Sequence, residues 1–144
     1  MDRFTETYIE MVSKAKEIQK LCKYNKGDWF IDFGDMPKKY GKGRFEILSR
    51  ELNYNNNLFK YFRENTKWLP TLEDLFGIAD WGHYSINKNI GDHGYYYGKE
   101  NLFGEIKYPG ETFSSLKEMV LAVVMEINYN KSWNGKVWEE RNGS

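Results

Sequence analysis

A strongly apolar, helix-periodic segment near the C-terminal end limits the architectures open to this chain. Its apolar side chains recur at steps of three and four residues, the spacing that gathers them on one face of a helix: Leu116, Met119, Val120, Val123, Val124 and Ile127. Leu121, Ala122 and Met125 extend the apolar surface around much of the circumference. Because such a helix is usually covered on more than one side, we expect it to be central to the fold.

Capping and turn residues mark both ends of this helix. Ser115 and Glu118 have the spacing of a capping box, in which a hydroxyl accepts a hydrogen bond from a free amide of the first turn. Beyond the helix, Asn134-Gly135 is a pair that favours the positive φ angles of a tight reversal. This turn would place Trp133 and Trp138 on either side of it, where both rings are expected to fold back over the helix.

The N-terminal half contains several shorter patterns. Residues 5–23 have the periodicity of a helix, and the short apolar run at 29–33 favours a strand. Residues 45–48 are predicted either as a second strand or as the entry to a helix. Short helices are expected at 57–64 and at 71–77, where capping residues and a final glycine mark the second of them.

Residues 80–109 differ in composition from the rest of the chain, because Gly, Tyr, Asn and charged residues alternate there. Three strands are predicted, at 81–86, 94–97 and 102–108, joined by turns that contain glycine. Such strands form an antiparallel meander with one face toward the helices. The predicted fold class is α+β: a small antiparallel sheet packs against the central C-terminal helix and an N-terminal helix.

Length and charge bound the classes of protein to consider. A chain of 144 residues is predicted to form one globular domain over residues 1–140, followed by a disordered tail at 141–144. A chain of this length buries a substantial core without metals or disulfides, so we expect no cofactor and no metal. Its 21 basic and 21 acidic residues give a net charge of zero, so it lacks the global field that draws proteins to nucleic acid.

The same composition predicts a cytoplasmic protein. Cys22 is the one cysteine and cannot form an intramolecular disulfide, which favours an intracellular location. No window approaches the roughly 18 apolar residues that a membrane span needs, and the N-terminal residues lack the apolar core of a signal peptide. We therefore expect no membrane partner. The sequence does not predict an oligomeric state.

Aromatic residues make up 17% of the chain, and eleven of them are tyrosines. A tyrosine combines an apolar ring with a hydroxyl that stays hydrated, so an excess of tyrosines indicates half-buried sheet faces or a contact surface. Packing of the sheet is the plainer interpretation. If a contact surface exists, its candidates are Trp81, Tyr95, Tyr96 and Tyr97, because they lie in the polar meander and not beside the main helix.

A cationic loop offers a different surface. Lys38, Lys39, Lys42 and Arg44 surround Tyr40, and nucleic-acid contacts are supplied mostly by lysine and arginine. A short basic loop is more often solvated surface, and that alternative stays open.

Catalytic signatures are absent from the sequence. His83 and His93 lie near Asp80, Asp92 and Glu105, and such groups bind zinc or transfer protons when strands bring them together. Their spacing does not require this, and the chain has no His-Glu-x-x-His motif, paired cysteines or phosphate-binding glycine loop. We therefore expect no catalytic residues and no enzymatic activity.

Three groups of motifs resemble one set of proteins. They are Lys16-Glu17-Ile18-Gln19 followed by Gly27-Asp28-Trp29, Trp68-Leu69-Pro70-Thr71, and the apolar helix followed by Tyr129-Asn130-Lys131-Ser132-Trp133-Asn134-Gly135-Lys136-Val137-Trp138. Together they resemble small uncharacterised proteins encoded by phages and prophages of low-GC Gram-positive bacteria. The Trp-Asn-Gly-x-x-Trp ending is the most specific of these motifs.

This resemblance implies phage origin and a place in the cytoplasm of the host cell. Its motifs are structural, and with the small size they lead us to expect a non-enzymatic binding protein. Such a protein would act on a host protein or a small ligand, as counter-defence factors do. The alternative is an accessory of phage replication or packaging that binds nucleic acid through the basic loop. A salt-dependent affinity that falls when Lys38, Lys39, Lys42 and Arg44 are replaced would favour that alternative.

Overall fold

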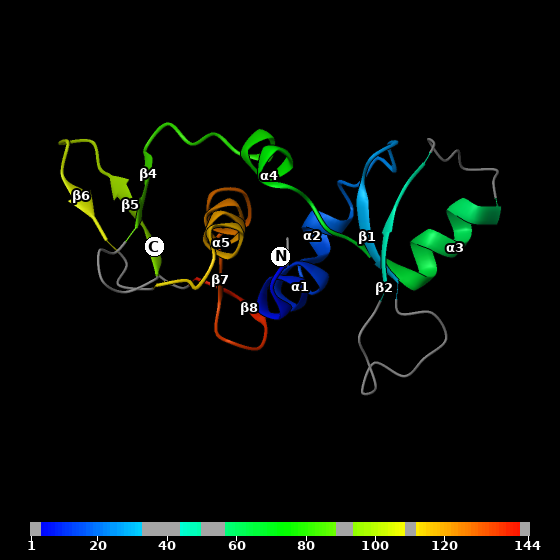
Figure 1. The fold of residues 1–144 in the computed structure, drawn as a ribbon. Helices are drawn as coiled ribbons and strands as arrows, with labels where there is room; N and C mark the ends of the chain where they lie inside the picture. The colour runs from blue at the N-terminus through cyan, green and yellow to red at the C-terminus, as the bar shows by residue number, and fades with distance from the viewer. Residues whose placement is uncertain (1–3, 33–43, 50–56, 89–93, 109–111, 142–144) are drawn as a thin grey trace. The chain divides into compact units, whose positions relative to one another are not determined.

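The computed structural model describes residues 4–32, 44–49, 57–88, 94–108 and 112–141. It contains both helices and antiparallel strands, as predicted for the α+β class (Figure 1). The helices are α1 (Glu6–Ser13), α2 (Lys16–Gln19), α3 (Asn57–Asn65), α4 (Leu72–Ile78) and α5 (Leu116–Tyr129). The strands are β1 (Trp29–Asp32), β2 (Arg44–Ile47), β3 (Thr66–Trp68), β4 (Tyr84–Lys88), β5 (Tyr95–Glu100), β6 (Ile106–Lys107), β7 (Lys131–Trp133) and β8 (Trp138–Glu140).

The chain forms two compact units. One consists of Met1–Met11 and Leu72–Ser144, and the other of Val12–Thr71. One domain over residues 1–140 stays a prediction. Of the predicted tail, residues 142–144 lie outside the described residues.

Helix α5 is the centre of the first unit. Every residue from Glu118 to Met125 is buried, which confirms the expectation drawn from its nearly continuous apolar character. Helix α4 and strands β5 and β7 pack against it (Figure 1). A fully buried Leu, Val or Met contributes roughly 1.5–3 kcal/mol through the apolar surface it removes from water, so this helix supplies a large share of the unit's stability.

The predicted cap at the start of α5 and the predicted turn beyond its end are confirmed. The Ser115 hydroxyl accepts a hydrogen bond from the backbone N–H of Glu118 at 3.2 Å. Asn130 ends the helix in the left-handed conformation, with φ 53° and ψ 44°. The chain then forms the β7–β8 hairpin, in which Gly135 has a φ of 99° and Trp133 lies opposite Trp138. The indole N–H of Trp138 donates to the carbonyl of Met11 at 2.8 Å and so ties the hairpin to α1.

A buried carboxylate joins α1 to α5. Glu118 accepts hydrogen bonds from the hydroxyls of Thr5, at 2.8 Å, and Ser114, at 3.0 and 3.1 Å. Thr5 in turn accepts from the backbone N–H of Tyr8 at 3.0 Å, so the same hydroxyl caps the first turn of α1. One short polar cluster therefore satisfies the first turns of two helices that are far apart in the sequence.

The second unit contains a three-stranded antiparallel sheet in the order β2-β1-β3. The strand at residues 29–33, the strand alternative at 45–48 and the helix at 57–64 are confirmed by β1, β2 and α3. Strand β3 is not among the predicted elements.

The prediction of one helix over residues 5–23 is wrong, because α1 and α2 are separated at Ala15, which has φ −84° and ψ 80°. The side-chain amide of Gln19 donates to the carbonyls of Val12, at 3.0 Å, and Trp68, at 2.9 Å, and its oxygen accepts from the N–H of Trp68 at 2.8 Å. Gln19 thus pairs with the backbone of β3 as a neighbouring strand would.

Candidate functional site

The sheet of β4, β5 and β6 has two chemically different faces. The strands pair antiparallel in sequence order, which confirms the predicted meander. Successive side chains of a strand point to opposite faces, so Tyr84 and Tyr97 share one face while Tyr96 and Gly98 share the other. We call the first the inner face, because it is turned toward α5, and the second the outer face.

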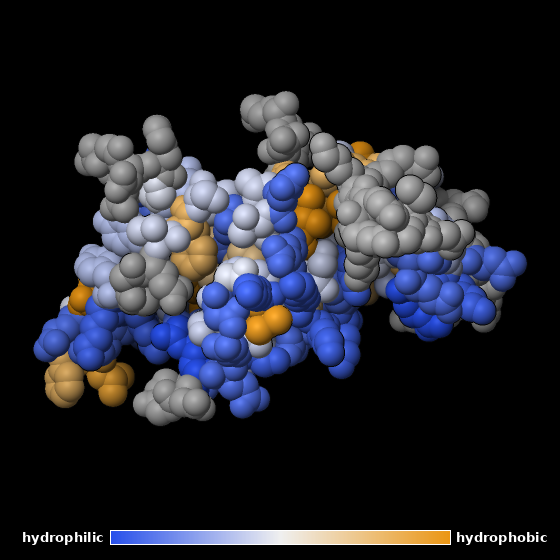
Figure 2. All heavy atoms as spheres, turned by 90° about the horizontal axis from the view of Figure 1, so that it is seen from below, coloured by the Kyte–Doolittle hydropathy of each residue, from blue (hydrophilic) through white to orange (hydrophobic). Residues whose placement is uncertain are grey.

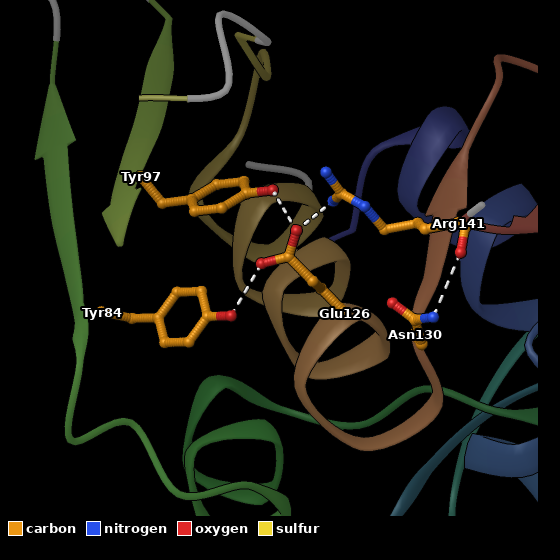
Figure 3. Close-up of polar contacts among 5 residues, drawn as sticks. All are labelled: Tyr84, Tyr97, Glu126, Asn130 and Arg141. Carbon is orange, nitrogen blue, oxygen red and sulfur yellow. Dashed lines mark hydrogen bonds and ion pairs between the residues drawn. The ribbon is translucent and has the colours of Figure 1, made fainter. Parts of the chain in front are cut away.

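The inner face is fixed by a polar cluster around Glu126 of α5. The hydroxyl of Tyr84 donates to Glu126 Oε2 at 2.8 Å, and that of Tyr97 donates to Glu126 Oε1 at 3.2 Å. The guanidinium of Arg141 forms an ion pair with the same carboxylate from the other side (Figure 3). The Glu126 side chain is only 10% exposed. Its negative charge is therefore compensated by two hydroxyl donors and one cation, as a carboxylate with little access to water requires.

The cation in this cluster is placed by the end of α5. Asn130 donates its side-chain N–H to the carbonyl of Arg141 at 3.2 Å, and the carbonyl of Asn130 accepts from the N–H of Arg141 at 2.9 Å (Figure 3). The β7–β8 hairpin thus returns the chain so that Arg141 lies next to Asn130 and reaches Glu126, which is one helical turn before Asn130. Arg141 is the first residue of the predicted tail, and it is held by both its backbone and its side chain.

The environment of the cluster changes the acidity of Tyr84. Burial raises the pKa of the Tyr84 hydroxyl above its ordinary range, and the hydrogen bond to Glu126 and the charge of that carboxylate raise it further. The charge of Arg141 acts in the opposite direction. Burial also raises the pKa of Tyr8, with a smaller contribution from the charge of Asp74.

These shifts predict a loss of stability in alkali. As the pH rises above the ordinary tyrosine pKa of about 10, the unfolded chain loses these protons before the folded chain does. The unfolded chain then binds fewer protons, so the free energy of unfolding falls, by at most about 1.4 kcal/mol per pH unit for each tyrosine. The effect of Tyr84 is smaller than this limit, because its ring is only partly buried and water screens its charge.

Urea unfolding between about pH 8 and pH 11 measures this dependence. Tyr84→Phe is expected to flatten the decline with pH, and Tyr8→Phe to flatten it separately. Tyr108→Phe makes the same chemical change on the outer face, away from Glu126, and serves as the matched control. Equal slopes in all four proteins would contradict the assignment.

The outer face carries aromatic and apolar side chains at its centre. Tyr108 is 54% exposed and Ile106 50% exposed, and the rings of Tyr96 and Tyr108 meet edge to face with centroids 5.6 Å apart. Gly98 makes this possible. A Cβ at that position would lie 2.8 Å from Ile106 Cγ2 and 2.9 Å from both Ser85 Oγ and Tyr108 Cε1. The missing side chain of Gly98 therefore lets Tyr108 and Ile106 approach the backbone of β5 closely.

The turn between β5 and β6 exposes two more apolar side chains. Leu102 is 98% exposed and Phe103 is 88% exposed. In Figure 2, hydrophobic side chains project from the lower left of the surface, at the end of the β4–β6 sheet. The prediction of a strand over 102–108 is correct only for its second half, because residues 102–104 form this turn. Asn101 and Gly104, three residues apart, are the signal that could have identified it, since turns favour Asn at the first position and Gly at the fourth.

The four predicted contact residues occupy different environments. Tyr96 lies on the outer face. Tyr97 is 2% exposed and belongs to the interior, where it binds Glu126, so its ring is not part of an exposed surface. Tyr95 pairs with Phe113 through its backbone, and the Lys88 ammonium lies 5.7 Å from the centre of its ring.

Trp81 precedes β4 and packs between two other rings. Its ring centroid is 5.1 Å from that of Phe76 and 6.4 Å from that of Tyr84. Its indole N–H is buried and has no hydrogen-bond partner among the residues that the structure describes. The structure therefore brings Trp81 to the edge of the inner-face tyrosines and separates it from Tyr96.

The other sequence candidates are only partly described. Lys38, Lys39 and Lys42 lie outside the described residues, and Arg44 begins β2 with a side chain that is not described. His93 and Asp92 also lie outside them, whereas His83 is exposed and its carbonyl accepts from the N–H of Glu100 at 2.8 Å. Nucleic-acid binding by the basic loop stays a prediction.

Two further findings concern the described ranges alone. Within them, no three His, Cys, Asp or Glu side chains are grouped so that they could hold a metal ion. No helix in the same ranges has the length and apolar character needed to cross a bilayer.

Comparisons with protein-family models, with curated proteins and with solved structures gave no match to this chain.

Proposed function

We propose that this chain is a non-enzymatic binding protein of phage origin that acts in the host cytoplasm by occupying a host protein. Its contact surface is the outer face of the β4–β6 sheet, together with the adjoining turn. The observation that carries the proposal is the exposure of Ile106 and Tyr108, which lie close over the backbone at Gly98. Exposed aromatic rings on a rigid support are typical of protein interfaces.

The two faces of the sheet have different roles in this proposal. The inner face is bound to Glu126 through two tyrosine hydroxyls, so the sheet is held to α5 without using the outer side chains. The outer face is consequently free to contact a partner. An open sheet face suits a protein better than a small ligand, because small-molecule sites are concave and enclose most of the ligand.

A role in counter-defence follows from the proposed origin and mode of action. A protein without catalytic residues can block a host factor only by binding to it. Affinity purification from an infected host, with mass spectrometry of the proteins and small molecules that come with the chain, identifies the partner. Recovery of nucleic acid, with an affinity that falls steeply as salt is added, would instead favour the replication or packaging alternative.

Tyr108→Ala is expected to weaken binding of the identified partner at least tenfold. Truncating a tyrosine that acts as a hot spot near the centre of an interface costs about 2 kcal/mol or more, and about 1.4 kcal/mol corresponds to tenfold in affinity. Val137→Ala is the control, because Val137 is an exposed apolar residue of the β7–β8 turn. Calorimetry with both variants, after their thermal unfolding has been shown to match the parent, gives the comparison. Unchanged affinity with Tyr108→Ala would remove Tyr108 from the contact surface.

A further inference from the structure

The turn that joins β5 to β6 is unusual in what it exposes. Leu102 and Phe103 are adjacent in the sequence, and both are almost completely exposed. Single exposed apolar residues are common on protein surfaces, but a contiguous apolar group at the tip of a turn marks a contact site more often than chance placement does. We propose that these two side chains are the anchor of the partner contact and insert into an apolar pocket of a partner protein. This inference rests on the proposed function and names the residues and the kind of surface that recognise the partner.

The backbone of this turn is fixed before any partner binds. The side-chain oxygen of Asn101 accepts hydrogen bonds from the N–H groups of Phe103, at 2.9 Å, and Glu105, at 3.0 Å. The N–H of Asn101 donates to the carbonyl of Glu105 at 2.8 Å, and the N–H of Gly104 donates to the carbonyl of Asn101 at 3.1 Å. Gly104 has a φ of 80°, which a residue with a side chain rarely adopts.

This network has a direct consequence for binding. Ordering a loop at an interface costs free energy, and a loop that is already ordered avoids most of that cost. The two apolar side chains are therefore presented on a rigid support. A hydrogen-bonded turn that holds Leu102 and Phe103 in water has no evident value for the stability of the chain itself.

The charges around the turn favour a protein over a lipid surface. Lys99, Glu100, Glu105 and Lys107 are all exposed, and they carry two positive and two negative charges. A loop that inserts into an anionic membrane is accompanied by an excess of lysine and arginine, which gains about 1 kcal/mol for each cation near the surface. Here the two acidic residues cancel that gain. A rim of mixed charge around an apolar centre is the usual composition of a protein interface.

The shape of the turn also disfavours a second copy of the chain as the partner. A two-fold contact places the same patch of both copies together, and a projecting turn is not complementary to itself. The area is small as well. A buried phenylalanine contributes roughly 150–250 Å², whereas a stable interface buries about 800 Å² on each partner. A pocket that receives the turn while its rim contacts Tyr108 and Ile106 is complementary to the turn and adds to the buried area.

Site-specific crosslinking tests the position of this anchor. Phe103 is replaced by the photoreactive residue p-benzoyl-phenylalanine in the full chain, produced in a low-GC Gram-positive bacterium, and Val137 is replaced in the same way as the control. We expect one discrete protein adduct from position 103 and none of that mass from position 137. Mass spectrometry of the adduct is expected to place the crosslink among apolar residues of the partner.

Affinity measurements with that purified partner complete the test. Leu102→Ser and Phe103→Ser are each expected to raise Kd at least tenfold, whereas Val137→Ser should leave it unchanged. Flotation with vesicles of phosphatidylcholine and phosphatidylglycerol tests for binding to a lipid surface. Light scattering of the free chain tests for binding to a second copy of the chain. Lipid binding or dimerisation that depends on Leu102 and Phe103, the absence of an adduct at 103, or an unchanged Kd would each overturn the inference.

The outcome also separates this inference from the proposed function. If Tyr108→Ala weakens partner binding and the two serine variants do not, the outer face is the contact surface and the turn is not its anchor. If none of the three variants changes the affinity, both proposals fail together.

Discussion

Leu121→Ala is expected to lower the free energy of unfolding by about 2–5 kcal/mol, the range for removing a buried leucine side chain. Leu121 is 0% exposed and lies in the middle of the fully buried stretch of α5. The loss combines the transfer free energy of the removed atoms with the cost of the cavity left behind. Because α4, β5 and β7 all pack against this helix, the surrounding elements have little freedom to close that cavity.

Leu102→Ala is the matched control for this prediction. It removes the same atoms from a side chain that is 98% exposed, so it should change the free energy of unfolding by no more than about 0.5 kcal/mol. Denaturation in urea, followed by circular dichroism, measures both variants. Two equal losses, or a small loss from Leu121→Ala, would show that α5 is not the centre of a packed core.

The helix α5 and its boundaries were predictable because their signals are local. The apolar period, the hydroxyl of Ser115 and the Asn134-Gly135 turn each lie within a few residues of the structure they specify. Local signals also located the meander, since its strands follow one another in the sequence and pair with their neighbours.

The elements that were missed depend on partners far away in the sequence. Strand β3 is three residues long, and it pairs with β1, more than thirty residues earlier. The break between α1 and α2 contains neither Gly nor Pro, and Gln19, the last residue of α2, binds the backbone of Trp68. A periodicity within one segment contains no information about such a partner, so neither feature could be inferred from it.

The sequence predicted the strands of the β4–β6 sheet but not which side chains lie on its inner and outer faces. Alternation along β5 requires that Tyr96 and Tyr97 point to opposite sides, but the sequence does not say which side is covered. Glu126 decides this, because its carboxylate binds Tyr97 and Tyr84 and thereby turns that face inward. Leu102 and Phe103 were assigned to a strand, although Asn101 and Gly104 indicated a turn.

Glu126 therefore determines which residues the sheet presents to a partner. Its hydrogen bonds hold the inner face against α5. Their loss should therefore change the position of the sheet, and with it the outer face, although no residue of the outer face is substituted. This links the stability of the cluster to the proposed contact surface. A partner contact that depends on Tyr108 should accordingly weaken when Glu126 is changed, even though Glu126 is nearly buried.

Glu126→Gln is expected to lower the free energy of unfolding by about 1.5–3 kcal/mol, the range for hydrogen bonds to charged groups. The amide keeps one acceptor oxygen, so it cannot accept from both tyrosine hydroxyls as the carboxylate does, and it leaves the charge of Arg141 uncompensated. Glu140→Gln makes the same chemical change at an exposed position of β8 and should cost no more than about 0.5 kcal/mol.

A double-mutant cycle with Arg141→Met isolates the ion pair from the rest of the cluster. If Glu126 and Arg141 stabilise the fold together, the loss in the double variant is smaller than the sum of the two single losses by about 0.5–3 kcal/mol. The 30% exposure of the Arg141 side chain places the coupling toward the lower end, because water screens the charge. Strictly additive losses would mean that the tyrosine hydroxyls alone hold Glu126, and that Arg141 stabilises the end of β8 only through its backbone bonds to Asn130.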